Sequence, residues 1–367
     1  MIVAVPKEIM ENETRVALVP AVAADLIKNG LEVRIESGAG EHAFFTDEAF
    51  KKAGASIVDE KSKLFSEADV ILKINKPSED EVKLMKAGTV LICLLWSLQN
   101  EELVELLAKQ NVTALGMEAL PRISRAQKMD VLSSMSSIAG YKSVLIAANA
   151  LGKYLPMLMT AAGTIAPSKV LVLGAGVAGL QAIATAKRLG AVVEAFDVRP
   201  AVKEQVESLG ASFVEVPLDE TETETSGGYA KELSEKEKQK QREVIHERVS
   251  KSDIVITTAL IPGKLAPELV TAQMVEDMSH GAVIVDLASE QGGNCALTKP
   301  GETYKHNGVT IHGPLNLAAS LPIHASQLFA KNVTAVLLHL IQDGKLVFDF
   351  EDEITKGTTI THEGKRV

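Results

Sequence analysis

The stretch KVLVLGAGVAGLQAIATAKRLGAVVEAFDVRP, residues 169–200, decides the fold. A β-branched run at 169–173 is followed by a glycine-rich turn, a helix-like segment at 178–190, and a second apolar run that ends at Asp197. Strand, turn, helix and strand in this order are typical of the first half of a dinucleotide-binding Rossmann fold. The stretch therefore predicts a nucleotide cofactor, and it raises the question of what reacts with that cofactor.

The spacing of the glycines gives each of them a separate task. Gly174 permits the tight turn, Gly176 lets the backbone approach a pyrophosphate, and Gly179 lets the helix pack close to the strand. The phosphates would then meet free N–H groups at the positive end of the helix. Asp197 would accept hydrogen bonds from the adenosine ribose, and its charge would repel a 2′-phosphate. NAD(H) is therefore expected over NADP(H), and the nearby Arg199 weakens this discrimination a little.

Composition is typical of an ordinary soluble protein and argues against several kinds of partner. The chain has 367 residues, enough for two domains, with 46% hydrophobic and 23% charged residues. A net charge of -10 argues against nucleic acid. Cys93 and Cys295 are expected to be reduced and buried, which suits a cytoplasmic protein. No signal peptide is seen and no metal site is predicted. The closest approach to a membrane span, 143–163, is broken by polar residues and a proline, so no direct membrane insertion is expected.

Strand-like and helix-like segments alternate through the chain. This alternation predicts an α/β protein with two Rossmann-like domains, each a doubly wound parallel sheet. A long helical pattern at 129–152 is expected to carry the chain from the first domain to the second, and another at 325–341 to return it. The first domain is therefore expected to be discontinuous, with residues 1–130 completed by 322–367. The NAD(H)-binding domain is expected at 131–321.

One segment, residues 219–249, departs from the rest in composition because it is rich in charge and contains a Gly-Gly-Tyr sequence. One interpretation is a solvated loop followed by an exposed helix. The other is a lid over a bound ligand, in which Gly227 and Gly228 give hinge freedom and Tyr229 folds over the ligand. Both interpretations stay open at this point.

Longer stretches of the chain resemble one protein superfamily. They are VPKEIMENETRVALVP (5–20), PRISRAQKMDVLSSMSSIAGY (121–141), TTALIPGKLAP (257–267) and VIVDLASEQGGNC (283–295). The superfamily contains alanine dehydrogenase, saccharopine-type dehydrogenases of the lysine pathway, and the NAD(H)-binding subunit of proton-translocating NAD(P) transhydrogenase. The resemblance covers essentially the whole chain, so the remaining question is the branch to which it belongs.

Two positions separate the chain from the alanine dehydrogenase branch. Arg15 and Lys73 match the basic residues that grip the substrate carboxylate there, and they are also consistent with inherited scaffold residues. The acid–base histidine of that branch is replaced by Trp96, and the aspartate of its DQGG motif by Glu290. Glu290 can substitute for that aspartate, so Trp96 is the stronger of the two differences. Oxidation of an amine or alcohol to a carbonyl needs a proton transfer as well as a hydride transfer, and an indole cannot exchange protons at neutral pH.

Direct hydride transfer between two nicotinamides needs only alignment and exclusion of water, so it suits a chain without that histidine. The resemblance to the transhydrogenase branch implies catalytic nicotinamide-site residues Arg122, Gln127, Asp130 and Ser133. An alternative for Gln127 is that it merely caps the helix that starts near Asp130. The NAD(H)-binding residues implied by the resemblance and the glycine motif are Arg122, Ile123, Ser124, Gln127, Asp130, Ser133, Gly174, Gly176, Val177, Gly179, Asp197, Val198, Arg199, Gly228, Tyr229, Gln241, Ala259 and Leu260.

The same resemblance implies partners. NADP(H) is expected on a partner component, and a membrane-spanning component is expected to couple hydride transfer to proton translocation. A homodimer is expected, held at the cytoplasmic face of the inner membrane through its partner. Two alternatives stay open: a stand-alone NAD-dependent amino-acid dehydrogenase with rearranged acid–base residues, and a non-catalytic NAD-binding module.

Overall fold

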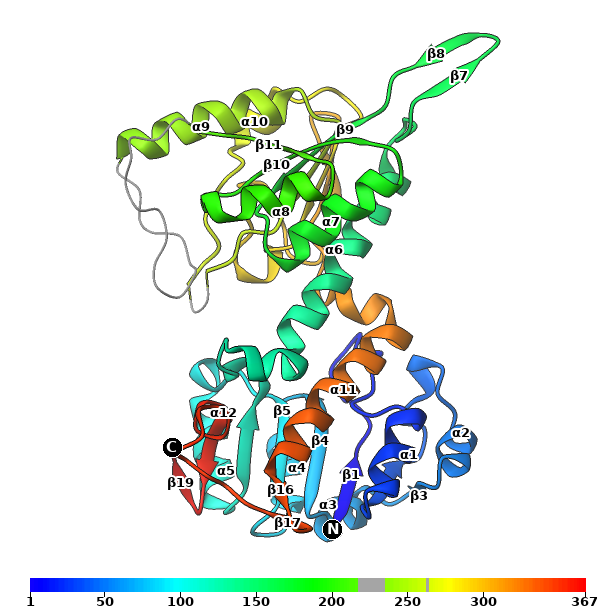
Figure 1. The fold of residues 1–367 in the computed structure, drawn as a ribbon, viewed down its shortest axis with the longest axis vertical. Helices are drawn as coiled ribbons and strands as arrows, with labels where there is room; N and C mark the ends of the chain where they lie inside the picture. Colours follow the sequence, from blue (N-terminus) through cyan, green and yellow to red (C-terminus); the bar gives the residue numbers. More distant parts are fainter. Residues whose placement is uncertain (217–234, 262–263) are drawn as a thin grey trace. The chain divides into compact units, whose positions relative to one another are not determined.

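The computed structural model of the chain divides into two compact units (Figure 1). One unit combines Met1–Met135 with Ala318–Val367, and the other is Ser136–Leu317. The structure describes residues 1–216, 235–261 and 264–367, with the backbone alone at 235–238. Both ends of the chain thus contribute to the first unit, and the boundaries expected from the sequence lie a few residues from this division.

The first unit is built on a mainly parallel sheet. Its strands are β1 (Ile2–Val5), β2 (Glu32–Glu36), β3 (Ser56–Val58), β4 (Val70–Asn75), β5 (Val90–Leu94), β6 (Thr113–Gly116), β18 (Thr359–His362) and β19 (Lys365–Arg366). They are ordered β19-β18-β6-β5-β4-β1-β2-β3, and only the pairings of β18 with β6 and with β19 are antiparallel among the strands described. The chain runs outward from β1 in both directions, which is the predicted doubly wound arrangement.

Helices from both ends of the chain cover this sheet (Figure 1). They are α1 (Pro20–Lys28), α2 (Asp47–Lys52), α3 (Lys61–Glu67), α4 (Glu79–Leu84), α5 (Glu101–Lys109), α11 (Pro322–Leu340) and α12 (Glu353–Thr358), and a hairpin of β16 (Ile341–Gln342) and β17 (Lys345–Leu346) follows α11. Phe329, Val333 and Leu337 of α11 lie in the same buried cluster as Val3 and Ile92 of the sheet. The first unit therefore has no complete core without the C-terminal segment.

The second unit contains the predicted nucleotide-binding sheet. Its strands are β9 (Lys169–Leu173), β10 (Val192–Phe196), β11 (Ser212–Phe213), β12 (Ile254–Thr257), β13 (Val283–Asp286), β14 (Thr303–His306) and β15 (Val309–His312). They are ordered β11-β10-β9-β12-β13-β15-β14, and the described pairs are parallel except β14 with β15. The order reverses between β9 and β12. Ligands of such sheets bind at this point, outside the carboxyl ends of the strands. The predicted fold class is confirmed.

Helices and one hairpin complete the second unit. The helices are α7 (Val177–Arg188), α8 (Lys203–Ser208), α9 (Glu235–Ser250) and α10 (Ala272–Glu276), and the hairpin pairs β7 (Leu158–Thr160) with β8 (Gly163–Ile165). The two cysteines of the chain, Cys93 in the first unit and Cys295 in the second, are both free and buried, as expected.

The predicted connecting helix is α6 (Val131–Ala150). Among the residues described, it is the one helix long and apolar enough to cross a membrane, with a mean hydropathy of 1.3. The sequence-based prediction that 143–163 is the closest approach to a membrane span is wrong in this respect, because 131–150 has the required length and composition. Val131 packs in the core of the first unit, and Val144 and Ala147 pack in the core of the second. A helix in the core of a soluble protein can have the same length and apolar composition, so α6 alone is weak evidence for a membrane span.

Candidate functional site

The turn between β9 and α7 leaves room for a ligand beside the start of the helix. Gly174 has a φ of +99°, which side-chain-bearing residues rarely adopt, and a Cβ on it would lie 2.6 Å from Oγ1 of Thr258. A Cβ on Gly179 would lie 1.8 Å from the carbonyl oxygen of Gly174, so this close contact of helix and turn requires glycine. A Cβ on Gly176 would meet nothing within 4 Å. A pyrophosphate could therefore approach the backbone N–H groups in the first turn of α7.

The carboxylate of Asp197, just after β10, is already occupied. Its Oδ1 accepts hydrogen bonds from the backbone N and from Nε of Arg199, both at 2.9 Å. Its Oδ2 accepts from the backbone N of Ala175 at 2.7 Å and from Nη2 of Arg199 at 2.9 Å. A carboxylate offers about four lone-pair sites. A ribose hydroxyl could therefore bind Asp197 only where Arg199 gives up some of its pairing.

The remaining cofactor residues predicted in the second unit lie in several elements. Ala259 follows β12 and is hydrogen-bonded through its backbone to the side chain of Asn294, while the side chain of Leu260 is 43% exposed. Val198 is half-buried after β10, and Gln241 is half-buried on α9. Gly227, Gly228 and Tyr229, the residues of the predicted lid, lie outside the described residues.

In the first unit, the predicted nicotinamide residues surround the start of α6. The carboxylate of Asp130 accepts hydrogen bonds from the backbone N of Ser133 at 2.9 Å and from its hydroxyl at 2.6 Å. Asp130 is therefore the N-cap of α6. The alternative in which Gln127 caps this helix is wrong. The side chain of Gln127 is exposed and makes no hydrogen bond to the described residues. Arg122 is also exposed.

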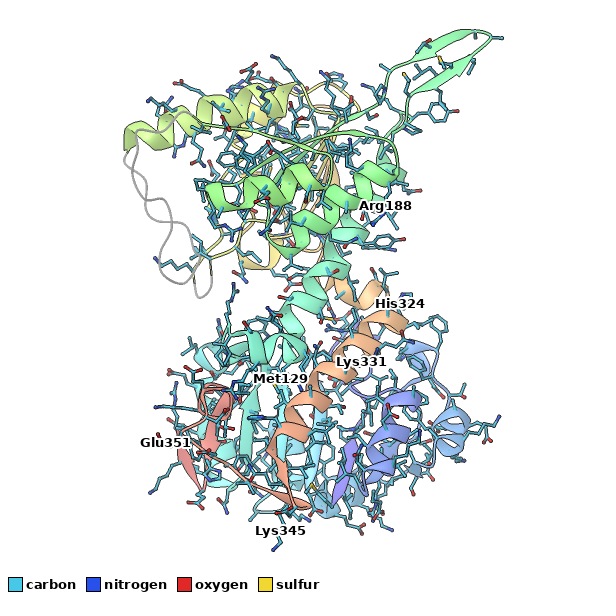
Figure 2. The ribbon with its side chains drawn as sticks, in the orientation of Figure 1. Met129, Arg188, His324, Lys331, Lys345 and Glu351 are labelled. Atoms are coloured by element: carbon cyan, nitrogen blue, oxygen red, sulfur yellow. The ribbon has the colours of Figure 1, made fainter. Side chains whose placement is uncertain are left out.

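The 3-10 helix η4 (Ser124–Met129), which carries Gln127, is anchored on α11. Met129 is buried in the core cluster of the first unit, and Figure 2 labels it together with Lys331 of α11. Nδ2 of the neighbouring Asn332 donates to the carbonyl oxygen of Lys128 at 2.8 Å. Of the other predicted residues in this stretch, Ile123 packs against the same cluster and Ser124 is exposed. Gln127 therefore projects from a firmly held backbone.

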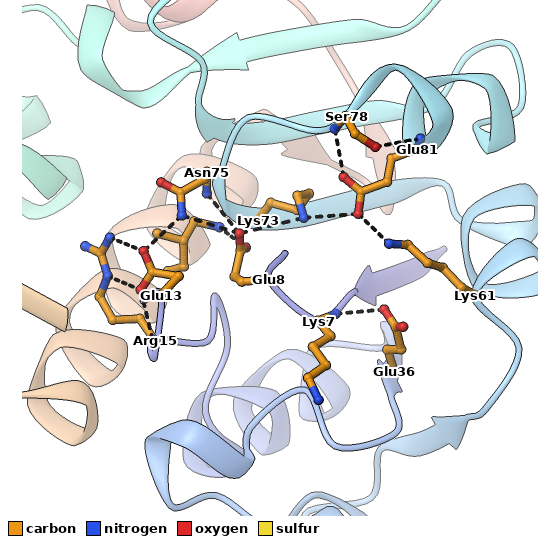
Figure 3. Close-up of polar contacts among 11 residues, drawn as sticks. Lys7, Glu8, Glu13, Arg15, Glu36, Lys61, Lys73, Asn75, Ser78 and Glu81 are labelled. Atoms are coloured by element: carbon orange, nitrogen blue, oxygen red, sulfur yellow. Dashed lines mark hydrogen bonds and ion pairs between the residues drawn. The ribbon is translucent and has the colours of Figure 1, made fainter. Parts of the chain in front are cut away.

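Arg15 and Lys73, the two basic residues predicted to match those of alanine dehydrogenases, are buried and paired (Figure 3). Nζ of Lys73, which has no exposed surface, lies 3.4 Å from Oε1 of Glu81 and 3.7 Å from Oε2 of Glu8. Arg15 forms a bidentate pair with Glu13, with distances of 2.7 Å from Nε and 2.6 Å from Nη2. An anionic substrate could reach either cation only by displacing a carboxylate of the protein itself.

Burial disfavours the charged form of the carboxyl groups in this cluster, and hydrogen bonds and nearby cations favour it. Burial raises the pKa of the Glu8 carboxyl, although the charge of Lys73 acts in the opposite direction. For Glu13, burial is outweighed by the hydrogen bonds and charge of Arg15, so its pKa lies below its usual value. Glu81 has a second cation in Lys61, at 2.8 Å. Each of these three carboxylates thus lies beside at least one cation, as buried charges require.

Trp96, which the resemblance predicts at the place of the acid–base histidine, lies just after β5. Its backbone is left-handed, with φ 51° and ψ 52°, and 40% of its surface is exposed. Glu118 fixes the turn by accepting hydrogen bonds from the backbone N of Leu95 at 3.0 Å and of Ser97 at 3.2 Å. The indole N–H can only donate a hydrogen bond. Glu290, in place of the DQGG aspartate, is exposed and accepts a hydrogen bond from the backbone N of Asn316.

Sequence reasoning missed two buried residues at the carboxyl edge of the second sheet. Asp286 ends β13, and Asn294 follows the EQGG sequence; neither side chain is exposed to solvent. The one sequence signal was an aspartate directly after the apolar run of a buried strand.

Across the described residues, no group of three or more His, Cys, Asp or Glu side chains could hold a metal ion.

A glycine turn at the reversal point of a doubly wound sheet, with an acid at the end of the next strand, defines a Rossmann-type nucleotide-binding protein. The chain belongs to the alanine dehydrogenase/PNT family. The family model described as "Alanine dehydrogenase/PNT, N-terminal domain" matches residues 4–139, and the one described as "Alanine dehydrogenase/PNT, C-terminal domain" matches 143–367.

Similarity within the family favours the transhydrogenase branch. An NAD(P) transhydrogenase alpha subunit of Rhodospirillum rubrum is 50% identical over 372 residues, which cover 99% of this chain and 97% of that protein. The solved structure of transhydrogenase from Sinorhizobium meliloti is 44% identical, with a TM-score of 0.90 and full coverage of both chains. Alanine dehydrogenase of Mycolicibacterium smegmatis is 31% identical over 373 residues, covering 100% and 94%. The predicted resemblance to the transhydrogenase branch is confirmed.

Proposed function

We propose that this chain is the NAD(H)-binding subunit of a proton-translocating transhydrogenase. A hydride passes directly between NAD(H) on this chain and NADP(H) on a partner component. The observation that carries the proposal is a tryptophan at position 96, where the resemblance predicts an acid–base histidine in an amino-acid dehydrogenase, because such an enzyme needs a proton acceptor and an indole is not one. Direct transfer between nicotinamides has no such need. The greater identity to transhydrogenase alpha subunits than to alanine dehydrogenase supports the same choice.

The nucleotide is held by two groups of residues. The glycine turn at 174–179 receives the pyrophosphate, and Asp197 selects the free ribose hydroxyls of NAD(H) over a 2′-phosphate. Arg122, Gln127, Asp130 and Ser133 serve the nicotinamide, with the Asp130–Ser133 hydrogen bonds holding those two side chains in place. The exposed amide of Gln127 can both donate and accept, so it suits alignment of two nicotinamide carboxamides.

The partners follow from the kind of protein that this chain resembles. The relatives are named as subunits, so the proposed activity requires further components: one that binds NADP(H) and one that spans the membrane and couples the transfer to protons. The proposed assembly contains a homodimer of this chain. It lies at the cytoplasmic face of the inner membrane and is attached through its partner rather than by insertion of its own helices.

The alternative of a stand-alone amino-acid dehydrogenase rests on Arg15 and Lys73. The buried carboxylates beside both cations speak against it, because a substrate carboxylate would have to displace Glu13 from Arg15, or Glu8 or Glu81 from Lys73. The other alternative is a non-catalytic NAD-binding module. Such a module would not need an exposed amide beside the nicotinamide, whereas Gln127 offers one.

One pair of assays tests the proposal. The purified chain is mixed with a purified NADP(H)-binding transhydrogenase component, and hydride transfer from NADPH on that component to an oxidised NAD analogue on this chain is followed by the distinct absorbance of the reduced analogue. The same chain alone is incubated with NAD⁺ and alanine, lysine or small hydroxy acids. Hydride exchange in the mixture and no NADH formation by the chain alone are expected. Turnover of alanine at rates normal for a dehydrogenase would overturn the proposal, and absence of exchange in the mixture would favour the non-catalytic module.

A further inference from the structure

A fully buried carboxylate stands at the carboxyl edge of the second sheet without a role in the site described so far. Asp286 ends β13, and its side chain has no exposed surface. Its two oxygens accept hydrogen bonds from Thr257 Oγ1 (2.8 Å), Ala288 N (3.0 Å), Asn294 N (2.8 Å), Cys295 N (3.0 Å) and Thr298 Oγ1 (2.6 Å). So many donors on one buried carboxylate fix the backbone that follows β13, including the position of Asn294.

The amide of Asn294 then holds the segment after β12. Its Oδ1 accepts from the backbone N of Ala259 at 2.9 Å, and its Nδ2 donates to the carbonyl oxygens of Ala259 and Pro267, both at 2.8 Å. The side chain thus bonds both backbone groups of Ala259, as a neighbouring strand would. The adjacent Thr258 donates through Oγ1 to the carbonyl oxygen of Gly174 at 3.0 Å. Hydrogen bonds thus run from Asp286 through Asn294 to Ala259, and the residue before Ala259 in the chain is bonded separately to the glycine turn.

The strand order shows which half of a dinucleotide this segment would meet. Asp197, at the end of β10, lies on one side of β9, and the segment after β12 lies on the other side. With the pyrophosphate at the glycine turn after β9 and the adenosine ribose at Asp197, the other half of the dinucleotide extends over the end of β12. The exposed side chain of Leu260 lies in this segment.

We propose that Asn294 is a positioning residue for the nicotinamide half of NAD(H), acting through the backbone of Ala259 and Leu260 and held in place by Asp286. The inference rests on the proposed NAD(H) binding. It predicts a split: disturbing Asn294 weakens binding of the whole dinucleotide and leaves binding of its adenosine half unchanged.

The test compares NADH with AMP, which lacks the nicotinamide half, by calorimetry. Asn294→Asp keeps the shape of the side chain and places an oxygen opposite the carbonyls of Ala259 and Pro267. NADH affinity is expected to fall by about tenfold, with AMP affinity within about twofold of the unmodified protein. Thr298→Val removes a single donor to Asp286, and it is expected to give a smaller loss of NADH affinity with the same split. If Asn294→Asp does not fold, the NADH and AMP affinities of Thr298→Val test the inference.

A matched control and three outcomes complete the design. Ser168 is 2% exposed, and its Oγ donates to the carbonyl oxygen of Tyr154 at 2.7 Å, before β9 and so at the opposite edge of the sheet. Ser168→Ala is expected to lower the melting temperature and to leave both affinities unchanged. Unchanged NADH affinity in Asn294→Asp, or an equal loss for NADH and AMP, would overturn the inference alone. An unmodified protein that binds neither nucleotide would overturn the proposed function as well.

Discussion

Replacement of Asp197 by alanine tests the basis of nucleotide choice. The substitution removes a carboxylate that accepts four hydrogen bonds, three of them from Arg199. A ribose hydroxyl that binds the carboxylate must take the place of some of this pairing, so its net contribution lies within the range of a hydrogen bond to a charged acceptor, about 1.5–3 kcal/mol. NADH affinity is therefore expected to fall roughly 10–100-fold.

The same substitution should bring the affinities for NADH and NADPH closer together. Without Asp197, the Arg199 guanidinium loses its bidentate carboxylate partner, and 26% of this arginine side chain is exposed. It can then pair with a 2′-phosphate, which arginine binds well. The unmodified protein should bind NADH more tightly than NADPH, and the ratio of the two affinities should fall in the variant by at least the factor lost for NADH.

Calorimetric titration of both nucleotides measures these affinities. Glu194→Ala is a suitable control because Glu194 lies in β10, the strand just before Asp197, and pairs with Arg248 at 3.1 Å, with both side chains partly exposed. The control should bind NADH within about twofold of the unmodified protein, as expected for a surface pair of little energetic weight. Equal binding of NADH and NADPH by the unmodified protein, or unchanged NADH affinity in Asp197→Ala, would refute the reasoning.

Three further variants test other regions of the molecule. Gln127→Asn, reconstituted with the partner, should slow single-turnover hydride transfer roughly 10–1000-fold, with little change in NADH affinity or melting temperature; a rate equal to that of the unmodified protein would remove Gln127 from the site. Gly179→Ala should abolish measurable NADH binding or folding, because its Cβ would lie 1.8 Å from a backbone oxygen, and a variant that binds normally would contradict the tight turn. Burial acts to raise the pKa of Asp352, but hydrogen bonds lower it from 3.8 to about 2, and the bond from Arg125 has the largest effect among them. Protonation of Asp352 removes this stabilisation, so the loss of stability in Arg125→Ala should be full above about pH 4 and fade toward pH 2 in acid-unfolding curves; a loss independent of pH would exclude this ion pair as its source.

The fold could be predicted because its deciding features are local in the sequence. The β-branched run, the glycine spacing and the acid at Asp197 lie within one short stretch, and each has a direct steric or electrostatic meaning. The long helices at both domain crossings were also visible as continuous helical patterns. The N-cap of α6 was not predicted, however: only Gln127 was considered for it, whereas a cap is decided by which side chain reaches the backbone N–H groups of the first turn, here that of Asp130.

Interactions between distant residues escaped prediction for a different reason. The sequence presents Arg199 as a possible neighbour of a phosphate, whereas the structure shows it bound to Asp197 in a bidentate pair. Asn294 lies far from Ala259 in sequence, and nothing local to either residue indicates that they meet. Such contacts depend on strand order and register, which bring segments together only after the sheet has formed.

The return of α11 to the first unit has a consequence for synthesis of the protein. On the ribosome, strands β1–β6 emerge first, but Phe329 and Val333, which cover the core of this sheet, emerge only after the whole second unit. At typical elongation rates, residues 136–340 take roughly 10–40 s to synthesise. For that time the nascent sheet has bare apolar surface, and its β6 edge lacks β18 as a partner. The nucleotide-binding unit, whose residues are all synthesised before α11, can complete its own fold during the same interval, ahead of the unit whose synthesis began first.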